Sequence, residues 1–361
     1  MKKKRIDVVL LIAVILISIF GVIMIYSSSN VWALYKFNDK YKYLKTQGLF
    51  LMVGYVIMAI VTKVSYREYL KKVNIIFGVC FLLLILVLIP GVGTVRNGSR
   101  SWFGIGGLGI QPSEFMKLGI IFFTAKYLTH NERILNNIKT GVLPILIVLL
   151  LVFGLIMLQP DFGTGVVLVM SIIAMLFVAG VNMSFFIKLG FLGLLGVVVL
   201  IIIAPYRMSR IVAFLNPWSD PLGSGFQIIQ SLYAIGPGGL LGLGLGNSIQ
   251  KHFYLPEPQT DFIFAIISEE LGFMGVLLVS LLFGIIIYRG FRIAINCKEL
   301  FGKYLAFGIT FGLAFQALLN LMVVVGLIPV TGVTLPFLSY GGSSLIISLI
   351  NMGILLNISK D

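Results

Sequence analysis

The stretch that decides the fold is residues 141–158, GVLPILIVLLLVFGLIML, which contains no charged side chain. A run of this length and composition crosses the hydrocarbon core of a bilayer as a helix. The rest of the chain is similar: of 361 residues, 59% are hydrophobic and 11% charged, with a mean hydropathy of +1.06. An ordinary soluble domain carries about 25% charged residues. The composition therefore excludes a soluble enzyme, a disordered chain and a coiled coil, and predicts an all-α polytopic membrane protein.

Ten apolar runs are long enough to cross the bilayer. They cover approximately residues 8–26, 46–62, 73–90, 112–128, 141–158, 162–181, 186–204, 260–288, 303–327 and 337–357. With loops on alternate sides, seventeen Lys and Arg residues lie on one side and nine on the other, while Lys117 lies within a span. The excess marks the cytoplasmic side. Both termini are thus predicted to be cytoplasmic, and membrane topology explains the net charge of +14 better than nucleic-acid binding does.

The N-terminal residues 1–7, MKKKRID, run directly into an apolar segment. No small-residue cleavage motif follows, so a retained first helix is favoured over a signal peptide. The whole chain, 1–361, is predicted to be one integral membrane domain. Its longest connection is an outward loop of about 205–259, where Phe226, Ile229, Leu232 and Tyr233 are predicted to share one face of a short interfacial helix. Long connections in compact bundles are usually functional.

Asp261 is the most informative acid of the chain. It lies in LPEPQTDFIFAIISEELGF, at the start of the eighth predicted span. One interpretation is that Thr260 and Asp261 cap the helix. The other is that Glu257, Gln259, Thr260 and Asp261 form a polar mouth in which a desolvated Asp261 acts as a general base. The residues alone favour the cap slightly and leave both interpretations open.

Two further segments carry candidate ligands for an anionic lipid. Arg100 and Trp102, in the 91–111 loop, suit an anionic headgroup with an apolar tail, or else an ordinary membrane interface. QPSEFMKLG, from Gln111, reads as a helix start with Glu114 in its first turn and Lys117 on the same face. Lys117 either pairs with Glu114 or reaches a phosphate.

The entry to the last span, TGVTLPFLSYGGSS, is unusually polar. Ser339 and Ser343 in it either permit close helix packing or line a substrate groove. The two cysteines, Cys80 and Cys297, predict no disulfide framework. The sequence holds no HExxH motif, no Cys/His cluster and no serine-hydrolase elbow, which removes the main support for a membrane protease or lipid hydrolase.

These motifs together resemble the SEDS family of RodA, FtsW and SpoVE proteins, and in particular its FtsW/SpoVE branch. The strings that carry the resemblance occur in order along nearly the whole chain: YSSS, NGSRSW, QPSEFMKL, QPDFGT, RIVAFLNPWSDPLGSGFQIIQSLYAIGPGGL, FYLPEPQTDFIFAIISEELGF and GLIPVTGVTLPFLSYGGSS. The resemblance implies a ten-span fold with both ends inside the cell. It also implies a peptidoglycan glycosyltransferase that polymerises lipid II at the outer face of the bacterial cytoplasmic membrane, for the division septum or the spore cortex.

The family's catalytic aspartate corresponds to Asp261, so the resemblance strengthens the general-base interpretation. The resemblance implies a reaction that inverts the anomeric carbon and releases undecaprenyl pyrophosphate. The negative charge of this leaving group requires nearby cations, and Arg100 and Lys117 are the favoured ones. Where FtsW-type sites carry a further acid before LPE, this chain has Phe253, so none is carried over. The predicted substrate-binding set is Arg100, Trp102, Glu114, Lys117, Arg207, Arg210, Lys251, Glu257, Gln259, Thr260, Ser339 and Ser343.

Two other functions remain possible from the sequence: a lipid II flippase and a non-catalytic scaffold for a transpeptidase. Polar residues gather at the outer mouth, whereas transporter sites lie near the bilayer midplane, which favours the polymerase. The implied partners are the lipid-linked glycan, a class B penicillin-binding protein, and division or sporulation proteins. No cofactor is assigned. A divalent cation stays possible, although no dedicated metal site is recognisable.

Overall fold

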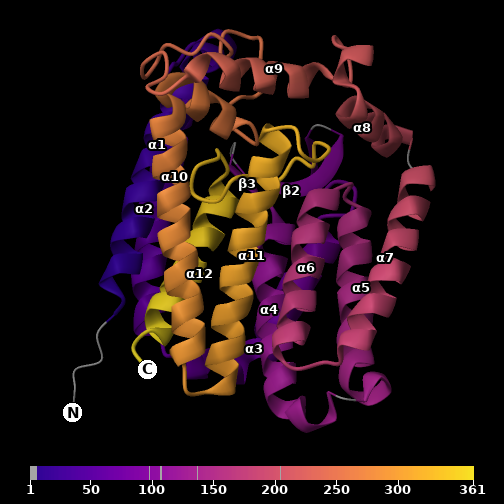
Figure 1. Cartoon of the computed structure of the whole chain (residues 1–361). Coiled ribbons are helices and arrows are strands. Elements are labelled where there is room, and N and C mark those ends of the chain that lie inside the picture. The colour runs from indigo at the N-terminus through magenta and orange to yellow at the C-terminus, as the bar shows by residue number, and fades with distance from the viewer. Residues whose placement is uncertain (1–5, 97, 106–107, 136, 204) are drawn as a thin grey trace.

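The computed structural model describes residues 6–361 except 97, 106–107, 136 and 204. The longer helices of the described residues run side by side as a bundle (Figure 1). They are α1 (Val8–Phe37), α2 (Lys42–Lys63), α3 (Tyr66–Leu86), α4 (Pro112–Asn131), α5 (Leu143–Met157), α6 (Phe162–Val178), α7 (Met183–Ile203), α10 (Ile263–Asn296), α11 (Leu300–Val324) and α12 (Gly342–Ile358). Short helices α8 (Pro205–Leu215) and α9 (Phe226–Ile235) lie across the end opposite the chain termini. We call this the loop end.

The membrane character of the fold is confirmed. By length and composition, six helical segments are apolar enough to cross a bilayer: α1, α2, α3, residues 138–157, α10 and α11. Residues 162–178, 183–196 and 342–358 form shorter apolar helices. Helix α4 is too polar for this criterion because it carries Glu114, Lys117 and Lys126. The count of ten spans therefore stays a prediction.

Helix α1 extends well beyond the predicted end near residue 26. Serine is disfavoured in helix interiors because its hydroxyl competes with the helix for hydrogen bonds to backbone groups. Here the Ser28 and Ser29 hydroxyls bond back to the Ile25 carbonyl, at 3.2 and 2.6 Å. The helix therefore continues through the serine segment to the loop end.

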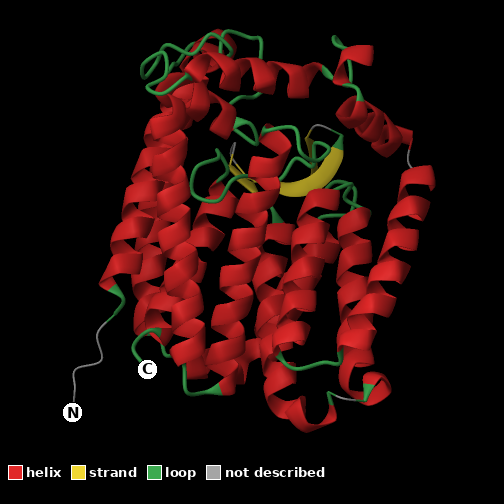
Figure 2. Cartoon of the chain, in the orientation of Figure 1, coloured by secondary structure: helices red, strands yellow, loops and turns green. Residues whose placement is uncertain are grey.

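A small antiparallel sheet, which the sequence did not predict, forms in the 91–111 connection. Its strands, in the order β1 (Thr94–Arg96), β2 (Ser99–Ile105) and β3 (Leu108–Ile110), lie among the loops at the loop end (Figure 2). The Ser101 hydroxyl donates to the Gln159 carbonyl at 3.1 Å, which ties β2 to the turn before α6.

The long predicted loop contains α8, α9, and 3-10 turns at Pro217–Ser219 (η3) and Gly236–Gly238 (η4). The short helix predicted around residue 229 is present as α9. Ile228, Ile229, Ser231 and Ala234 are buried, whereas Leu232 and Tyr233 are exposed. This buried face packs on the bundle beneath it, and the position of the helix along the membrane interface stays a prediction.

Helix α10 is broken at Gly272, whose φ of 59° and ψ of −153° are not helical. The coil after η4 fills the break. Phe273 N donates to Gly239 O at 2.9 Å and Leu243 N donates to Glu269 O at 2.9 Å, among other backbone bonds. A Cβ at Gly272 would lie 2.4 Å from Gly242 N, so glycine is required for this approach. The loop thus satisfies backbone groups that the break would leave unpaired.

Candidate functional site

Asp261 lies outside the span of α10, in the turn that precedes it. The N-cap of α10 is Phe262, and no side chain caps the helix. The capping interpretation of Thr260 and Asp261 is therefore wrong. The half-buried Asp261 instead has its Oδ1 2.9 Å from Thr260 Oγ1, which also lies 2.7 Å from the Glu257 carbonyl oxygen.

Burial raises the pKa of the Asp261 carboxyl above its usual range. The contact with Thr260 lowers this pKa, the charge of Glu257 raises it, and the charge of Arg210 lowers it, but burial dominates. A carboxylate that binds a proton more readily than usual is a better general base near neutral pH. The environment of Asp261 therefore suits proton abstraction.

Helix α11 supplies two amide side chains that the site analysis from sequence missed. Asn320 Nδ2 donates to Asp261 O at 2.7 Å and to Val333 O at 2.8 Å. Gln316 Oε1 accepts from Lys117 Nζ at 2.6 Å, and its Nε2 donates to Thr334 O at 3.0 Å. Two amides four residues apart lie on one helix face. Their presence in an otherwise apolar helix was the available signal.

Lys117 and Glu114 form the ion pair that the sequence suggested, with Nζ 2.9 Å from Glu114 Oε1. The pair lines a cavity of about 30 Å³ between α4, α6, α11 and α12, together with Gln316 and Asn351. The volume is enough for a water molecule. Asn351 Oδ1 is buried without a hydrogen-bond partner among the described residues, so the cavity retains unused hydrogen-bonding capacity.

Asp161 fixes the start of α4 beside this pair. Its Oδ1 accepts from Thr164 N at 3.1 Å and so caps α6. Its Oδ2 accepts from Gln111 Nε2 at 3.1 Å and from the Ser113 hydroxyl at 3.3 Å. Helix α4 begins at Pro112 with Glu114 in its first turn, as predicted. Asp161 thereby links the QPD and QPS segments.

The connection between α11 and α12, residues 325–341, forms hydrogen bonds with several parts of the site. Arg210 donates to Val330 O at 2.9 Å, and Tyr340 N donates to Gln259 O at 2.8 Å. Ser339 Oγ accepts from Leu335 N at 2.8 Å, while Ser343 Oγ accepts from Gln111 N at 3.0 Å. Ser339 thus bonds within its own turn, whereas Ser343 bonds to the backbone just before α4. The connection is a common support for the Asp261 side and the Lys117 side.

Arg100 and Trp102 lie on β2. Arg100 donates to the Leu88 carbonyl at 3.4 Å, and its buried Nε has no hydrogen-bond partner among the described residues. Thr94 Oγ1 donates to the Trp102 carbonyl at 3.0 Å. Within the described part of the chain, no hydrogen bond or ion pair joins either residue to Asp261 or Lys117. The side chain of Arg207 lies outside the described residues.

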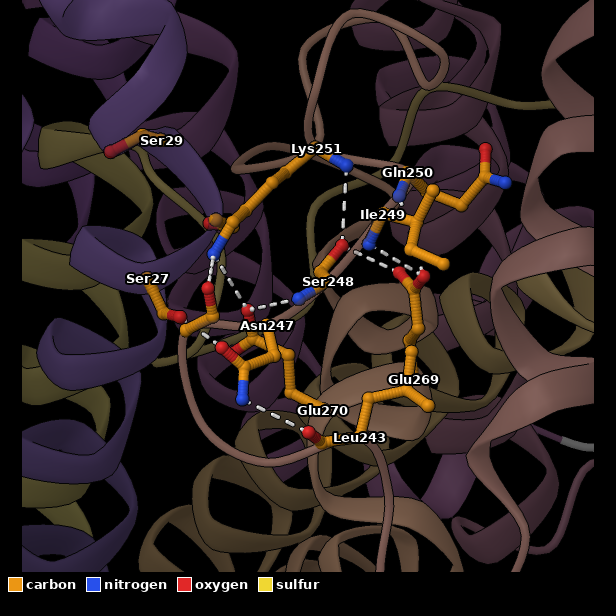
Figure 3. A network of polar contacts seen from close by, with 12 residues as sticks. Ser27, Ser29, Leu243, Asn247, Ser248, Ile249, Gln250, Lys251, Glu269 and Glu270 are labelled. Atoms are coloured by element: carbon orange, nitrogen blue, oxygen red, sulfur yellow. Dashed lines mark hydrogen bonds and ion pairs between the residues drawn. The ribbon is translucent and has the colours of Figure 1, made fainter.

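Lys251 lies in a different place from the one expected of a substrate ligand. It is 2% exposed, and its Nζ lies 3.1 Å from Glu270 Oε1 in a buried ion pair (Figure 3). Glu270 also accepts from the Ser27 hydroxyl of α1 at 2.5 Å. The ammonium is thus already neutralised inside the protein, and its substrate-binding role stays an untested prediction.

Neighbouring Glu269 accepts hydrogen bonds from the same loop (Figure 3). It accepts from the Ser248 hydroxyl at 2.5 Å, from Ile249 N at 2.8 Å and from Gln250 N at 3.3 Å. We call Ser27, Ser248, Lys251, Glu269 and Glu270 the glutamate latch. It fastens the loop to α10 and α1 a few residues before Asp261.

Comparison with known proteins decides the family. The profile of FtsW, RodA and SpoVE cell cycle proteins matches residues 7–361. This chain belongs to that family. Stage V sporulation protein E of Bacillus subtilis is 54% identical, over 99% of this chain and 98% of its own. A probable peptidoglycan glycosyltransferase FtsW of Trichlorobacter lovleyi is 44% identical, over 98% and 93%.

Solved structures of the family agree in fold. A chain of a peptidoglycan synthase complex that coordinates polymerisation and crosslinking superposes with a TM-score of 0.80 at 32% identity, covering 98% of this chain and 97% of the other. RodA of Thermus thermophilus superposes with a TM-score of 0.73 at 30% identity, covering 99% and 97%. The SEDS fold predicted from sequence is confirmed.

Cysteines and potential metal ligands are the remaining reactive side chains of the described residues. Cys80 and Cys297 are both buried and free, in agreement with the predicted lack of a disulfide framework. No group of three or more His, Cys, Asp or Glu side chains is arranged to hold a metal in the described part of the chain.

Proposed function

We propose that this chain is a peptidoglycan glycosyltransferase that polymerises lipid II at the outer face of the bacterial cytoplasmic membrane. The loop end faces outward and both termini lie in the cytoplasm. One membrane domain carries the site, with part of it on the 205–259 loop. The observation that carries the proposal is Asp261: an acid with a raised pKa, held at the loop end of a chain related to glycosyltransferases.

In the proposed reaction, the Asp261 carboxylate takes the proton of the acceptor 4-hydroxyl. The oxygen attacks the anomeric carbon of the lipid-linked glycan, the bond to the pyrophosphate oxygen breaks, and undecaprenyl pyrophosphate leaves. Asn320 fixes the backbone of the base, and Thr260 contacts the carboxylate. A base held in place before substrate arrives lowers the cost of reaching the transition state.

The departing pyrophosphate needs positive charge. Arg210 is exposed, and its charge lowers the pKa of Asp261, which supports it as a cation near the base. Lys117 is held by Glu114 and Gln316 beneath the same connection. We assign phosphate contacts to these two and to Arg100. Trp102 would meet the apolar tail.

The proposed partner is a class B penicillin-binding protein that crosslinks the nascent strand. It is supported by the family's likeness to a synthase complex of polymerisation and crosslinking. A division or sporulation role depends on which partner is present. The flippase and scaffold alternatives find less support, because the acids and amides described here gather toward the loop end.

The deciding experiment supplies labelled lipid II to the purified protein with its cognate transpeptidase and resolves glycan strands on a gel. Wild type is compared with Asp261→Asn, and folding of both is verified by thermal midpoint. Polymer from wild type alone supports the proposal. Polymer from a folded Asp261→Asn variant removes Asp261 as the base, and no polymer from either favours the flippase or scaffold.

A further inference from the structure

Three aromatic side chains gather at the loop end beside the candidate site. Trp32 and Tyr35 come from the end of α1, and Phe253 comes from the loop before Asp261. The Phe253 ring centroid lies 5.5 Å from that of Trp32 and 5.3 Å from that of Tyr35. We call these three residues the outer aromatic cluster.

The outer aromatic cluster leaves aromatic surface open. Tyr35 is 77% exposed and Phe253 is 48% exposed. Phe253 also adopts a left-handed backbone conformation, with φ of 68°, which is strained for a bulky residue. Such strain persists only where the surroundings enforce it, and it is common at ligand-binding positions. The loop therefore holds an apolar ring at the surface at a cost in conformational energy.

Polar groups connect this cluster to the base. Tyr43 lies near both Trp32 and Gln259, whose side chains act on its hydroxyl, as does the charge of Glu257. Glu257 also acts on Asp261. Glu257 and Gln259 thus connect the outer aromatic cluster, through Tyr43, to the segment that ends in Asp261.

Gln259 supplies the observation that points to a ligand. Its side chain is 2% exposed, and its Oε1 has no hydrogen-bond partner among the described residues. A buried amide oxygen without a partner costs free energy. Natural proteins usually retain such a group only for a ligand, a water or a function. A donor on a bound molecule would satisfy it.

We propose that the outer aromatic cluster, with Tyr43, Glu257 and Gln259, is a saccharide subsite next to Asp261. A pyranose ring has faces of C–H groups, which suit the negative face of an aromatic ring. Its rim of hydroxyl and amide groups suits Gln259, Glu257 and the Tyr43 hydroxyl. The subsite rests on the proposed function and refines it: the occupant is a sugar unit of the glycan, held beside the reacting pair.

Aromatic residues also anchor membrane proteins at the lipid interface. Lipid anchoring requires an apolar or amphipathic side chain. It does not require a flat ring at one fixed position. Phe253→Leu keeps the apolar character and removes the ring, whereas Phe253→Tyr keeps the ring. The two substitutions therefore separate sugar stacking from lipid anchoring and from packing.

The test measures binding of a lipid-free, radiolabelled chitin tetrasaccharide to the purified protein in detergent by equilibrium dialysis. The proteins are wild type, Phe253→Leu, Phe253→Tyr and Gln259→Leu. Trp218→Leu is the matched control, because Trp218 is an exposed aromatic whose ring contacts Tyr233 and no ring of the cluster. Thermal midpoints establish that each variant is folded.

We expect Phe253→Leu and Gln259→Leu to weaken binding by about 2- to 10-fold each, and Phe253→Tyr and Trp218→Leu to bind as wild type does. Equal binding by the Leu and Tyr variants of Phe253, or no saturable binding by wild type at millimolar tetrasaccharide, overturns the subsite. The polymerase can fail separately: a wild type that binds the tetrasaccharide but makes no strands from lipid II retains the subsite and loses the proposed activity.

Discussion

Acids lie on both sides of the start of α10, Asp261 before it and Glu269 and Glu270 after it, and they differ in how many hydrogen-bond partners they have. Glu269 and Glu270 are fully buried, and each receives three or more hydrogen bonds or ion-pair contacts from the loop and from α1. Asp261, eight residues earlier, has one side-chain hydrogen bond among the residues that the structure describes, with Thr260. A buried acid that is fully paired stabilises structure. An acid desolvated with few donors keeps its affinity for a proton.

The largest effect is expected when the under-paired acid is neutralised. Asp261→Asn removes the proton acceptor, so the polymerisation rate should fall by about 10²- to 10⁴-fold. Gel analysis of strands made from lipid II measures this. Asp39→Asn, at an acid that pairs with Lys45, provides the control for a change of one charge and should retain most of the rate.

The same substitution should not destabilise the fold at neutral pH. Because burial raises the pKa of Asp261 in the folded state, the folded protein binds this proton more tightly than the unfolded chain does. The contribution to stability is therefore fully present below the unfolded pKa and is lost as the pH rises through the folded pKa. At neutral pH, Asp261→Asn should have a thermal midpoint equal to or above that of wild type; a clear decrease would contradict this account of the acid.

The opposite result is expected for the glutamate latch. Lys251→Met leaves Glu270 buried without its cation, and breaking a buried ion pair typically costs about 3–5 kcal/mol. The thermal midpoint should fall markedly. The double variant Lys251→Met, Glu270→Gln should recover part of the loss.

A matched control for the latch lies on the other side of the molecule. Lys71 pairs with Glu68 at 2.8 Å, with both side chains exposed, and exposed pairs contribute little. Lys71→Met should leave the midpoint nearly unchanged. If Lys251→Met were equally silent, the latch would have no structural role.

A smaller effect is expected at Asn320, which fixes the backbone of Asp261. Asn320→Leu leaves the Asp261 and Val333 carbonyls without their donor, and an unsatisfied buried group costs about 1–3 kcal/mol. We expect the rate of polymerisation to fall more than the affinity for lipid II, measured side by side. A proportional loss of both would indicate general distortion.

The smallest effect is a shift in pH dependence. The charge of Glu257 raises the pKa of Asp261, and that of Arg210 lowers it. Glu257→Gln should lower this pKa, so the base is ionised at lower pH and the acid limb of the rate profile moves to lower pH. Arg210→Gln should move that limb to higher pH. Shifts in the same direction for both variants would exclude Asp261 as the group that titrates.

Much of this architecture was readable from the sequence because apolar length and charge placement determine membrane spans. The start of α4 at Pro112 and the Glu114–Lys117 pair depend on local spacing, so they too were predictable. The capping interpretation of Asp261 failed because the helix begins at Ile263, so that Phe262 and not Asp261 is its N-cap. The burial of Lys251 could not be predicted from local spacing because its partner, Glu270, lies beyond Asp261 on another element. Gln316 and Asn320 were missed because their roles depend on contacts with α4 and with the 325–341 connection.

The broken helix has a consequence for the order in which the protein is made. The segment that completes the hydrogen bonding around Gly272 includes Gly239 and Leu243, and it precedes α10 in the chain. Synthesis proceeds from the N-terminus, so this segment has already left the ribosome when α10 is produced. If it crosses the membrane first, the gap in α10 is filled as the helix inserts. Biogenesis of the outward loop and of this span is thereby a single event, and a chain cut between them would have to reassemble two incomplete pieces.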